Sequence, residues 1–335
     1  MNVPSVGDLS KNLQLRRDTG RIKTDLARLT NELSSGIDSN LVNRFKGNFG
    51  PLAGVERGLA RSESFLVVIA ERQLVFSSQQ VSITNLRALG DVSTSLLIAP
   101  DTSDPTLVES AGQDALSRFS SAIANLNAQS GGRSIFAGTT TDRPAVADAE
   151  VIFDEIEAEI ALVGAVTADA IASIVSDWFA IGGGYDTLGY IGGAAEQSGP
   201  RISEGEISPS SPTADEDAFR AFLSGLATGA LLGRGVLATE PQEQGRLARI
   251  SSLRLFEADA SLVNLQARIG TSEAQIERAR SEVLAESGSL QLARIELIGI
   301  DPYETAVELQ SAETQLQTLY SITARLSGLS LTSYL

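Results

Sequence analysis

The chain has 335 residues, with 26 Lys and Arg against 42 Asp and Glu, which gives a formal net charge of −16. Because so acidic a chain lacks the cations that neutralise phosphates, we expect it to bind no nucleic acid and no membrane. It contains no cysteine and no histidine. Disulfides, zinc sites built on these residues and catalysis by Ser-His-Asp or Cys-His pairs are therefore excluded.

The first predicted helix carries two apolar rows at the alternating three- and four-residue spacing of a coiled-coil seam. The rows are Leu15, Ile22 and Leu29, and Thr19, Leu26 and Leu33. Charged residues, Glu32 among them, are expected off the seam. Gly36 ends the pattern where a C-terminal helix cap is expected. We predict that residues 1–40 form an assembly helix.

Two further helices, at roughly 55–97 and 106–130, are predicted within residues 41–144 as the N-terminal part of a helical rod. From 145 to 238 the chain is rich in Gly, Asp, Ser and Pro, with short segments such as AEVIFDEI and GGGYDTLGYIGG. Turn residues and alternation there predict strands and hairpins with one or two helices, one of them around 214–232. We expect these residues to form an inserted outer domain.

The longest heptad pattern lies in residues 239–300, the predicted C-terminal rod helix. From Leu255 to Leu297 an apolar residue recurs every seventh position, enough for a helix of about 65 Å. Asp301 and Glu304 then have the spacing of a capping box, with Pro302 in the first turn. Residues 301–335 are predicted to form a second assembly helix. The fold class is thus mainly α: a long coiled-coil-like rod formed by both terminal segments, with a smaller α+β or β-rich insert.

Three stretches contain residues that chemical sites could use. GGGYDTLGYIGG (182–193) lacks the spacing of a dinucleotide loop and favours a turn-rich hairpin. APDTSDPT (99–106) lacks the further acidic ligands of a calcium loop and favours an interhelical turn. FDEIEAEI (153–160) favours a solvated acidic face. No catalytic, cofactor or metal site is predicted, and the chain is not expected to be an enzyme.

Three motifs, in order along the chain, carry a family resemblance. LTNELSSGI (29–37) resembles the end of the first helix of flagellins and flagellar hook-associated proteins. IANLNAQSGGRSIFAGTTTDRPAV (123–146) is similar to the exit from the third helix in the hook-associated protein 3 family, which forms the hook–filament junction. ITARLSGLSLTSYL (322–335) resembles the ending of that family. Residues 37–50, IDSNLVNRFKGNFG, depart from the family pattern of paired aspartates.

The resemblance, which covers about 1–145 and 240–335, implies specific roles for residues. Gly132, Phe136 and Gly138 would form the turn from rod to insert, with Phe136 pinning the turn to the rod and the following threonines beginning strand-like structure. The terminal helices would supply the assembly interface. Its residues would be Leu15, Ile22, Leu26, Leu29, Leu33, Leu309, Leu316, Leu319, Leu326, Leu331, Tyr334 and Leu335.

The resemblance also implies partners and a location. The chain would self-associate in a ring or helical layer, and would contact a larger hook-associated protein, flagellin and a cytosolic export chaperone. It would be extracellular in the bacterial flagellum, exported by the flagellar apparatus without a cleaved signal peptide, in accord with an N-terminus that lacks an apolar signal core. Two alternatives remain open: a flagellin or flagellin-like filament subunit, and a displayed ligand-binding or hydrolytic module in the insert.

Overall fold

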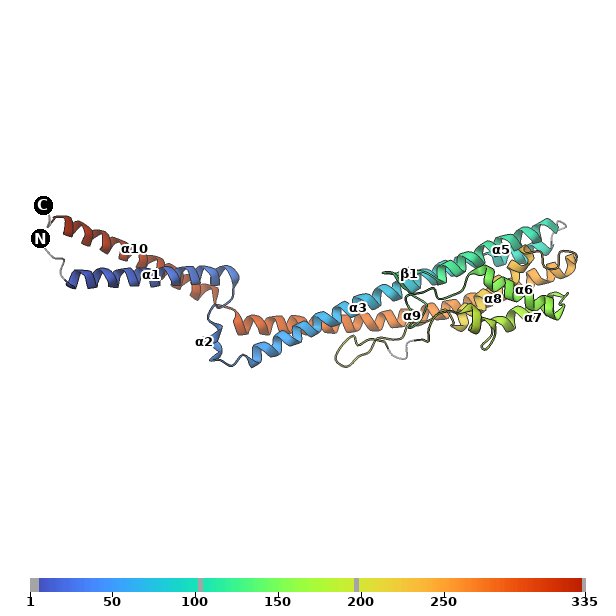
Figure 1. Ribbon diagram of the computed structural model, residues 1–335, viewed down its shortest axis with the longest axis horizontal. Helices are drawn as coiled ribbons and strands as arrows, with labels where there is room; N and C mark the ends of the chain where they lie inside the picture. Colours follow the sequence, from blue (N-terminus) through green and yellow to red (C-terminus); the bar gives the residue numbers. More distant parts are fainter. Residues whose placement is uncertain (1–5, 102–104, 196–198, 333–335) are drawn as a thin grey trace. The chain divides into compact units, whose positions relative to one another are not determined.

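The computed structural model describes residues 6–101, 105–195 and 199–332, without the side chains of 6–9, 12, 101, 105 and 326–332. The fold is mainly α (Figure 1). The chain forms two compact units, Met1–Glu63 with Ala285–Leu335, and Ser64–Leu284. No helix in the described ranges has the length and apolar content needed to cross a bilayer.

The first unit pairs the two ends of the chain. It contains α1 (Val6–Ser35), α2 (Leu41–Phe45), the start of α3 (Gly50–Leu89), the end of α9 (Pro241–Ile298) and α10 (Pro302–Thr332). Helices α1 and α10 lie side by side (Figure 1) and share a small apolar cluster. Helix α10 begins at Pro302, as the predicted cap at Asp301 requires.

The second unit is built on the rest of α3 and α9, which run antiparallel. Gln80 Nε2 donates to the carbonyl of Gln266 at 3.0 Å, and seven residues further along α3 Arg87 pairs with Asp259 at 2.7 Å. Between the two helices the heptad rows are buried, as the sequence predicts. The buried residues are Ile69, Phe76 and Ile83 on α3, and Leu255, Leu262, Ile269, Ile276 and Val283 on α9.

Short helices complete the core of this unit. They are α4 (Val92–Ile98), the 3₁₀ turn Ala99–Asp101, α5 (Pro105–Leu126), α6 (Ala149–Val163), α7 (Ala168–Phe179) and α8 (Asp217–Gly233). Helices α5 and α8 approach closely at two glycines, because a Cβ on Gly112 would lie only 2.5 Å from the backbone nitrogen of Gly233. Such contact requires residues without side chains.

The insert contains less β-structure than its composition suggests. AEVIFDEI, which the sequence predicts to be strand-like, lies in α6. Within GGGYDTLGYIGG, Tyr185–Gly189 forms a π-helical turn and not the predicted hairpin. Across the described ranges the sheet structure is one hairpin, β1 (Gln129–Ser130) with β2 (Arg133–Ser134), and a few isolated bridges. Burial explains the difference, since Ile152, Phe153 and Ile156 enter the core from one helical face.

Candidate assembly surfaces

The α1–α10 pair is held by a short apolar seam. Ile22 and Leu29 on α1 are buried with Ala312 on α10, and Leu309, Leu316 and Leu319 pack against them. At the edge of the pair the ammonium of Lys23 lies 5.9 Å from the ring centroid of Tyr320. The two terminal stripes thus cover each other, which neither helix could do alone.

The predicted interface residues fall into four groups. Ile22 and Leu29 are buried, and Leu15, Leu26, Leu309, Leu316 and Leu319 are half-buried. Leu33 is 40% exposed. The side chains of Leu326 and Leu331 in α10, and the whole of Tyr334 and Leu335, lie outside the described residues. The assembly role of all these residues stays a prediction.

A buried carboxylate, that of Glu32, ends the α1 seam. Glu32 was expected off the seam, yet it is only 3% exposed. Its two oxygens accept from Arg28 Nη1 at 3.0 and 2.8 Å, and Oε1 also accepts from the backbone nitrogen of Ser39 at 3.0 Å. Burial of a carboxylate is tolerable because these donors replace water. The i, i+4 spacing of Arg28 and Glu32 was the one sequence signal for this contact.

Beyond α1 the chain is hydrogen-bonded to the connection between α9 and α10. We call this region, residues 36–44 and 296–301, the joint. Gly36 has a φ of 72°, and its carbonyl accepts from the nitrogen of Ile300 at 3.1 Å. The nitrogen of Asp38 donates to the carbonyl of Ile298 at 2.9 Å. The sequence pattern did not predict the joint, which includes part of the segment 37–50 that departs from the expected family pattern.

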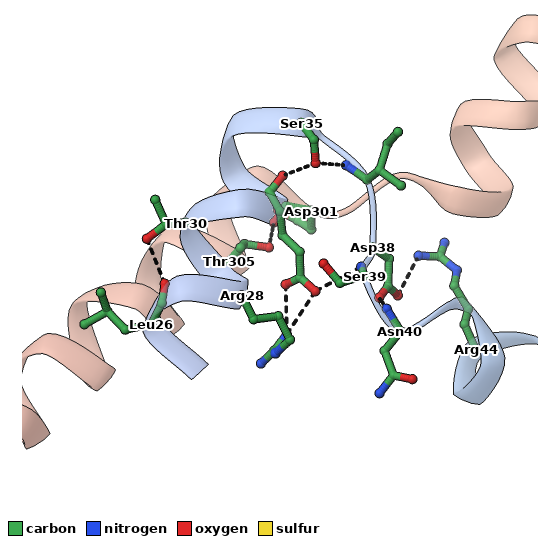
Figure 2. Close-up of polar contacts among 12 residues, drawn as sticks. Leu26, Arg28, Thr30, Ser35, Asp38, Ser39, Asn40, Arg44, Asp301 and Thr305 are labelled. Carbon is green, nitrogen blue, oxygen red and sulfur yellow. Dashed lines mark hydrogen bonds and ion pairs between the residues drawn. The ribbon is translucent and has the colours of Figure 1, made fainter. Parts of the chain in front are cut away.

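Arg44 and Asp301 complete the joint from either side (Figure 2). Arg44 donates from Nη1 to the carbonyl of Gly299 at 2.7 Å and from Nη2 to that of Glu296 at 2.9 Å. The carbonyl of Glu296 lies in the last turn of α9, where it lacks a helical partner, and Gly299 directly follows the helix. Asp301 Oδ1 accepts from the nitrogens of Tyr303 at 2.9 Å and Glu304 at 3.2 Å. The predicted N-cap at Asp301 is therefore confirmed.

The turn from α5 into the insert is a glycine hairpin. Gly131 and Gly132 have φ values of 58° and 77° and join β1 to β2, as a type I′ turn requires. Gly138 has a φ of 59°, and a Cβ there would lie 2.5 Å from the carbonyl oxygen of Ala194. Both features explain why this stretch is so rich in glycine.

Phe136 is fully buried in the core cluster that also contains Phe76 of α3. It packs edge-on against Phe219 of α8, with ring centroids 5.1 Å apart. A hydrogen bond also joins this turn to α3, because Gln79 Nε2 donates to the carbonyl of Ile135 at 2.7 Å. The threonines that follow form turns rather than a strand; Thr140 Oγ1, for example, donates to the carbonyl of Ala137 at 3.1 Å.

Two titratable side chains of the insert, those of Arg234 and Tyr185, make contacts within the fold. Arg234 lies against three carboxylates of α6, Glu150, Asp154 and Glu157, and the hydrogen bond with Glu157 is the main reason that the pKa of Arg234 is raised. Burial raises the pKa of Tyr185, whose hydroxyl donates to the carbonyl of Ala214 at 2.8 Å. Within the described ranges no group of three or more acidic side chains is placed to hold a metal ion.

Part of the chain matches a known family. Residues 255–335 match the family described as the bacterial flagellin C-terminal helical region. No curated protein matches the sequence. Among solved structures, the chain is similar to FlgL of Bacillus cereus, with 12% identity over 71% of this chain and 96% of that one and a TM-score of 0.47. It is also similar to a putative flagellar hook-associated protein of Vibrio parahaemolyticus, with 14% identity, 71% and 95% coverage and a TM-score of 0.40.

Proposed function

We propose that this chain, whose residues 255–335 match the C-terminal helical region of flagellins, is a structural component of the bacterial flagellum at the junction of hook and filament. The observation that carries the proposal is the pairing of α1 with α10, because α10 lies within the matched residues. The chain acts by assembly, as an adaptor needed for filament attachment and motility.

The seam explains how assembly would be driven. Among the described side chains its buried apolar part consists of Ile22, Leu29 and Ala312, while Tyr320 and Ile322 on α10 are 49% and 42% exposed. A groove of about 440 Å³ runs between the helices, lined by Ile22 and Leu319 and by polar residues such as Gln315. Neighbouring subunits would cover these surfaces. Burial of apolar area on association would then offset the entropic cost of ordering the helices.

The proposed partners follow from that position. Copies of the chain would associate in a ring or helical layer, with a larger hook-associated protein on one side and flagellin on the other. A cytosolic chaperone would hold the chain before export through the flagellar apparatus. The motif SIFAGTTT (134–141) favours the junction family over flagellin, which is the second candidate.

A deletion strain tests the proposal. Cells without the gene should still make and export flagellin but shed it into the medium, because the hook lacks the surface on which filament subunits dock. The measurement is flagellin in the supernatant against flagellin on cells, with hooks counted by electron microscopy. Loss of the filament material itself would indicate a flagellin. Attached filaments of normal length would reject the structural role in favour of a displayed module.

A further inference from the structure

The outward side of α3 in the second unit carries an apolar row that stays exposed. Val67, Leu74 and Val81 stand seven residues apart and are 57%, 55% and 61% exposed. The inward rows of α3 form the buried core, and this row is not among the buried residues of that core. A regular exposed apolar row of this kind marks an interaction surface.

The outward side of α9 has the complementary character. Ala267, Ala274 and Ser281 are exposed at the same seven-residue spacing, so small side chains leave room there for larger ones. The charges beside the two rows are also complementary. Glu71 lies three residues before Leu74, and Arg278 lies four residues after Ala274. Within the described chain neither Glu71 nor Arg278 forms an ion pair.

The register of α3 against α9 places the two surfaces at one level. Gln73 Nε2 donates to Glu277 Oε2 at 2.7 Å, and Gln80 Nε2 to the carbonyl of Gln266 at 3.0 Å, so α9 descends as α3 rises. Leu74 and Ala274 therefore stand at about the same height on opposite helices. When two copies lie side by side in one orientation, α3 of one runs antiparallel to α9 of the next.

In that arrangement each residue of the α3 row lies opposite a small residue of α9 in the next copy. With Leu74 opposite Ala274, a step of seven residues puts Val67 opposite Ser281 and Val81 opposite Ala267, so each large side chain meets a small one. The same register brings Glu71 to the level of Arg278. A contact that pairs two different faces is heterologous and continues from copy to copy, closing a ring or extending a helix. An ion pair between Glu71 and Arg278 would set the register of the two helices and would add little to the affinity.

We propose that the Val67–Leu74–Val81 row of α3 packs on the Ala267–Ala274–Ser281 face of α9 in a second copy of this chain. This inference rests on the proposed function, because it takes the copies to stand side by side in one orientation. It names the lateral surface of that assembly, which neither the sequence motifs nor the α1–α10 seam identifies.

The absence of cysteine from the chain makes the test direct. A full-length chain carrying Leu74→Cys and Ala274→Cys is expressed in the deletion strain, and isolated flagella are oxidised and separated on a non-reducing gel. A ladder of dimers, trimers and larger species is expected, since each copy offers one thiol to either neighbour. The single variants should give no ladder. A matched control pairs Ala274→Cys with Leu162→Cys, which is 87% exposed but lies off the α3 row.

Charge reversal supplies a second readout. Glu71→Arg in the double-cysteine chain should lower the yield of the ladder several-fold, and adding Arg278→Glu should restore it. Absence of a ladder while the double-cysteine chain is present in flagella with attached filaments overturns the surface and leaves the proposed function standing. Dimers of Leu74→Cys alone also overturn it, because they show a symmetric contact. Filaments attached in the deletion strain reject the function itself.

Discussion

Arg44 of α2 donates to the carbonyl of Gly299 at 2.7 Å, across 255 residues of sequence. A second bond from the same guanidinium to the carbonyl of Glu296 means that one side chain ties the connection after α1 to the end of α9. The backbone bonds between Asp38 and Ile298 and between Ile300 and Gly36 lie beside it. The joint therefore depends on a residue within IDSNLVNRFKGNFG (37–50), a segment that departs from the expected family pattern.

Replacement of Arg44 by alanine should loosen the joint without unfolding the second unit. Bonds from a charged donor to two carbonyls at a partly exposed site are worth about 1–2 kcal/mol together. Hydrogen exchange at the amides of Asp38 and Ile300 should become faster by roughly tenfold, since 1.4 kcal/mol is a factor of ten. Arg57→Ala, in the same unit but bonded within its own helix, is the control. Unchanged protection in Arg44→Ala would show that the backbone bonds suffice.

Gly138→Ala should destabilise the second unit. Alanine is strained at a φ of 59°, and its Cβ would press on the carbonyl oxygens of Ala194 and Gly193 at 2.5 and 2.6 Å. Together these effects should cost about 2–3 kcal/mol. The measurement is urea unfolding followed by the fluorescence of Trp178, the one tryptophan of the chain.

A matched control for Gly138 is Gly131→Asn. Gly131 also has a positive φ, of 58°, but a Cβ there meets nothing within 4 Å. Asparagine tolerates this conformation, so a loss of under about 1 kcal/mol is expected. Equal losses in the two variants would contradict the role given to the close approach at Gly138.

Parts of the fold that depend on one regular period were predictable from the sequence. The α9 row from Leu255 to Val283 is buried at every seventh residue, because one helical face packs into the core of the second unit over this range, whereas Leu290 and Leu297 of the same predicted row are half-buried. The cap at Asp301 was predictable because capping is local in sequence. The mainly α fold follows from these elements.

The insert and the joint were less predictable, for different reasons. In α6 Val151 is 46% exposed while Ile152, Phe153 and Ile156 are buried, a helical pattern too short to distinguish from a buried strand. The joint depends on pairings such as Gly36 with Ile300, and no local period encodes a contact between opposite ends of a chain. Leu33 stays exposed because α1 ends two residues later, before the chain turns at Gly36. The division into five segments stays a prediction.

Stability should fall at alkaline pH through the tyrosines of the insert. Burial raises the pKa of Tyr190 to about 12 and also raises that of Tyr185. In the unfolded chain these phenols ionise near pH 10. The folded state then holds more protons than the unfolded state, so stability is intact below pH 10 and is lost as the pH rises from about 10 to 12.

The measurement for the tyrosines is the urea midpoint between pH 8 and 11.5. Tyr190→Phe should begin less stable, because it loses the bond from its hydroxyl to the carbonyl of Gly193 at 2.6 Å, and should show a shallower alkaline decline. Tyr303→Phe is the control, since Tyr303 is 81% exposed. A decline of equal steepness in wild type and Tyr190→Phe would assign the pH dependence to other groups.

Leu319→Asp should separate assembly from folding. Leu319 packs against the cluster of Ile22, Leu29 and Ala312, and a carboxylate there has no donor to replace water. The cost to the α1–α10 pair should be about 1–3 kcal/mol, comparable to the stabilisation that so small a seam supplies. Since Trp178 lies in the other unit, its thermal transition should stay within about 2 °C of wild type, as expected for a negligible effect on that unit.

The cellular readout decides whether that seam is an assembly surface. Leu319→Asp should restore neither filament attachment nor motility to the deletion strain, although the chain is made and exported. Val307→Asp, also on α10 and 52% exposed, is the matched control and should keep the free pair intact. If it too abolishes attachment, the outer face of α10 is also covered in the assembly. Normal swimming with Leu319→Asp, at wild-type levels of exported chain, would show that junction formation does not need the α1–α10 pair.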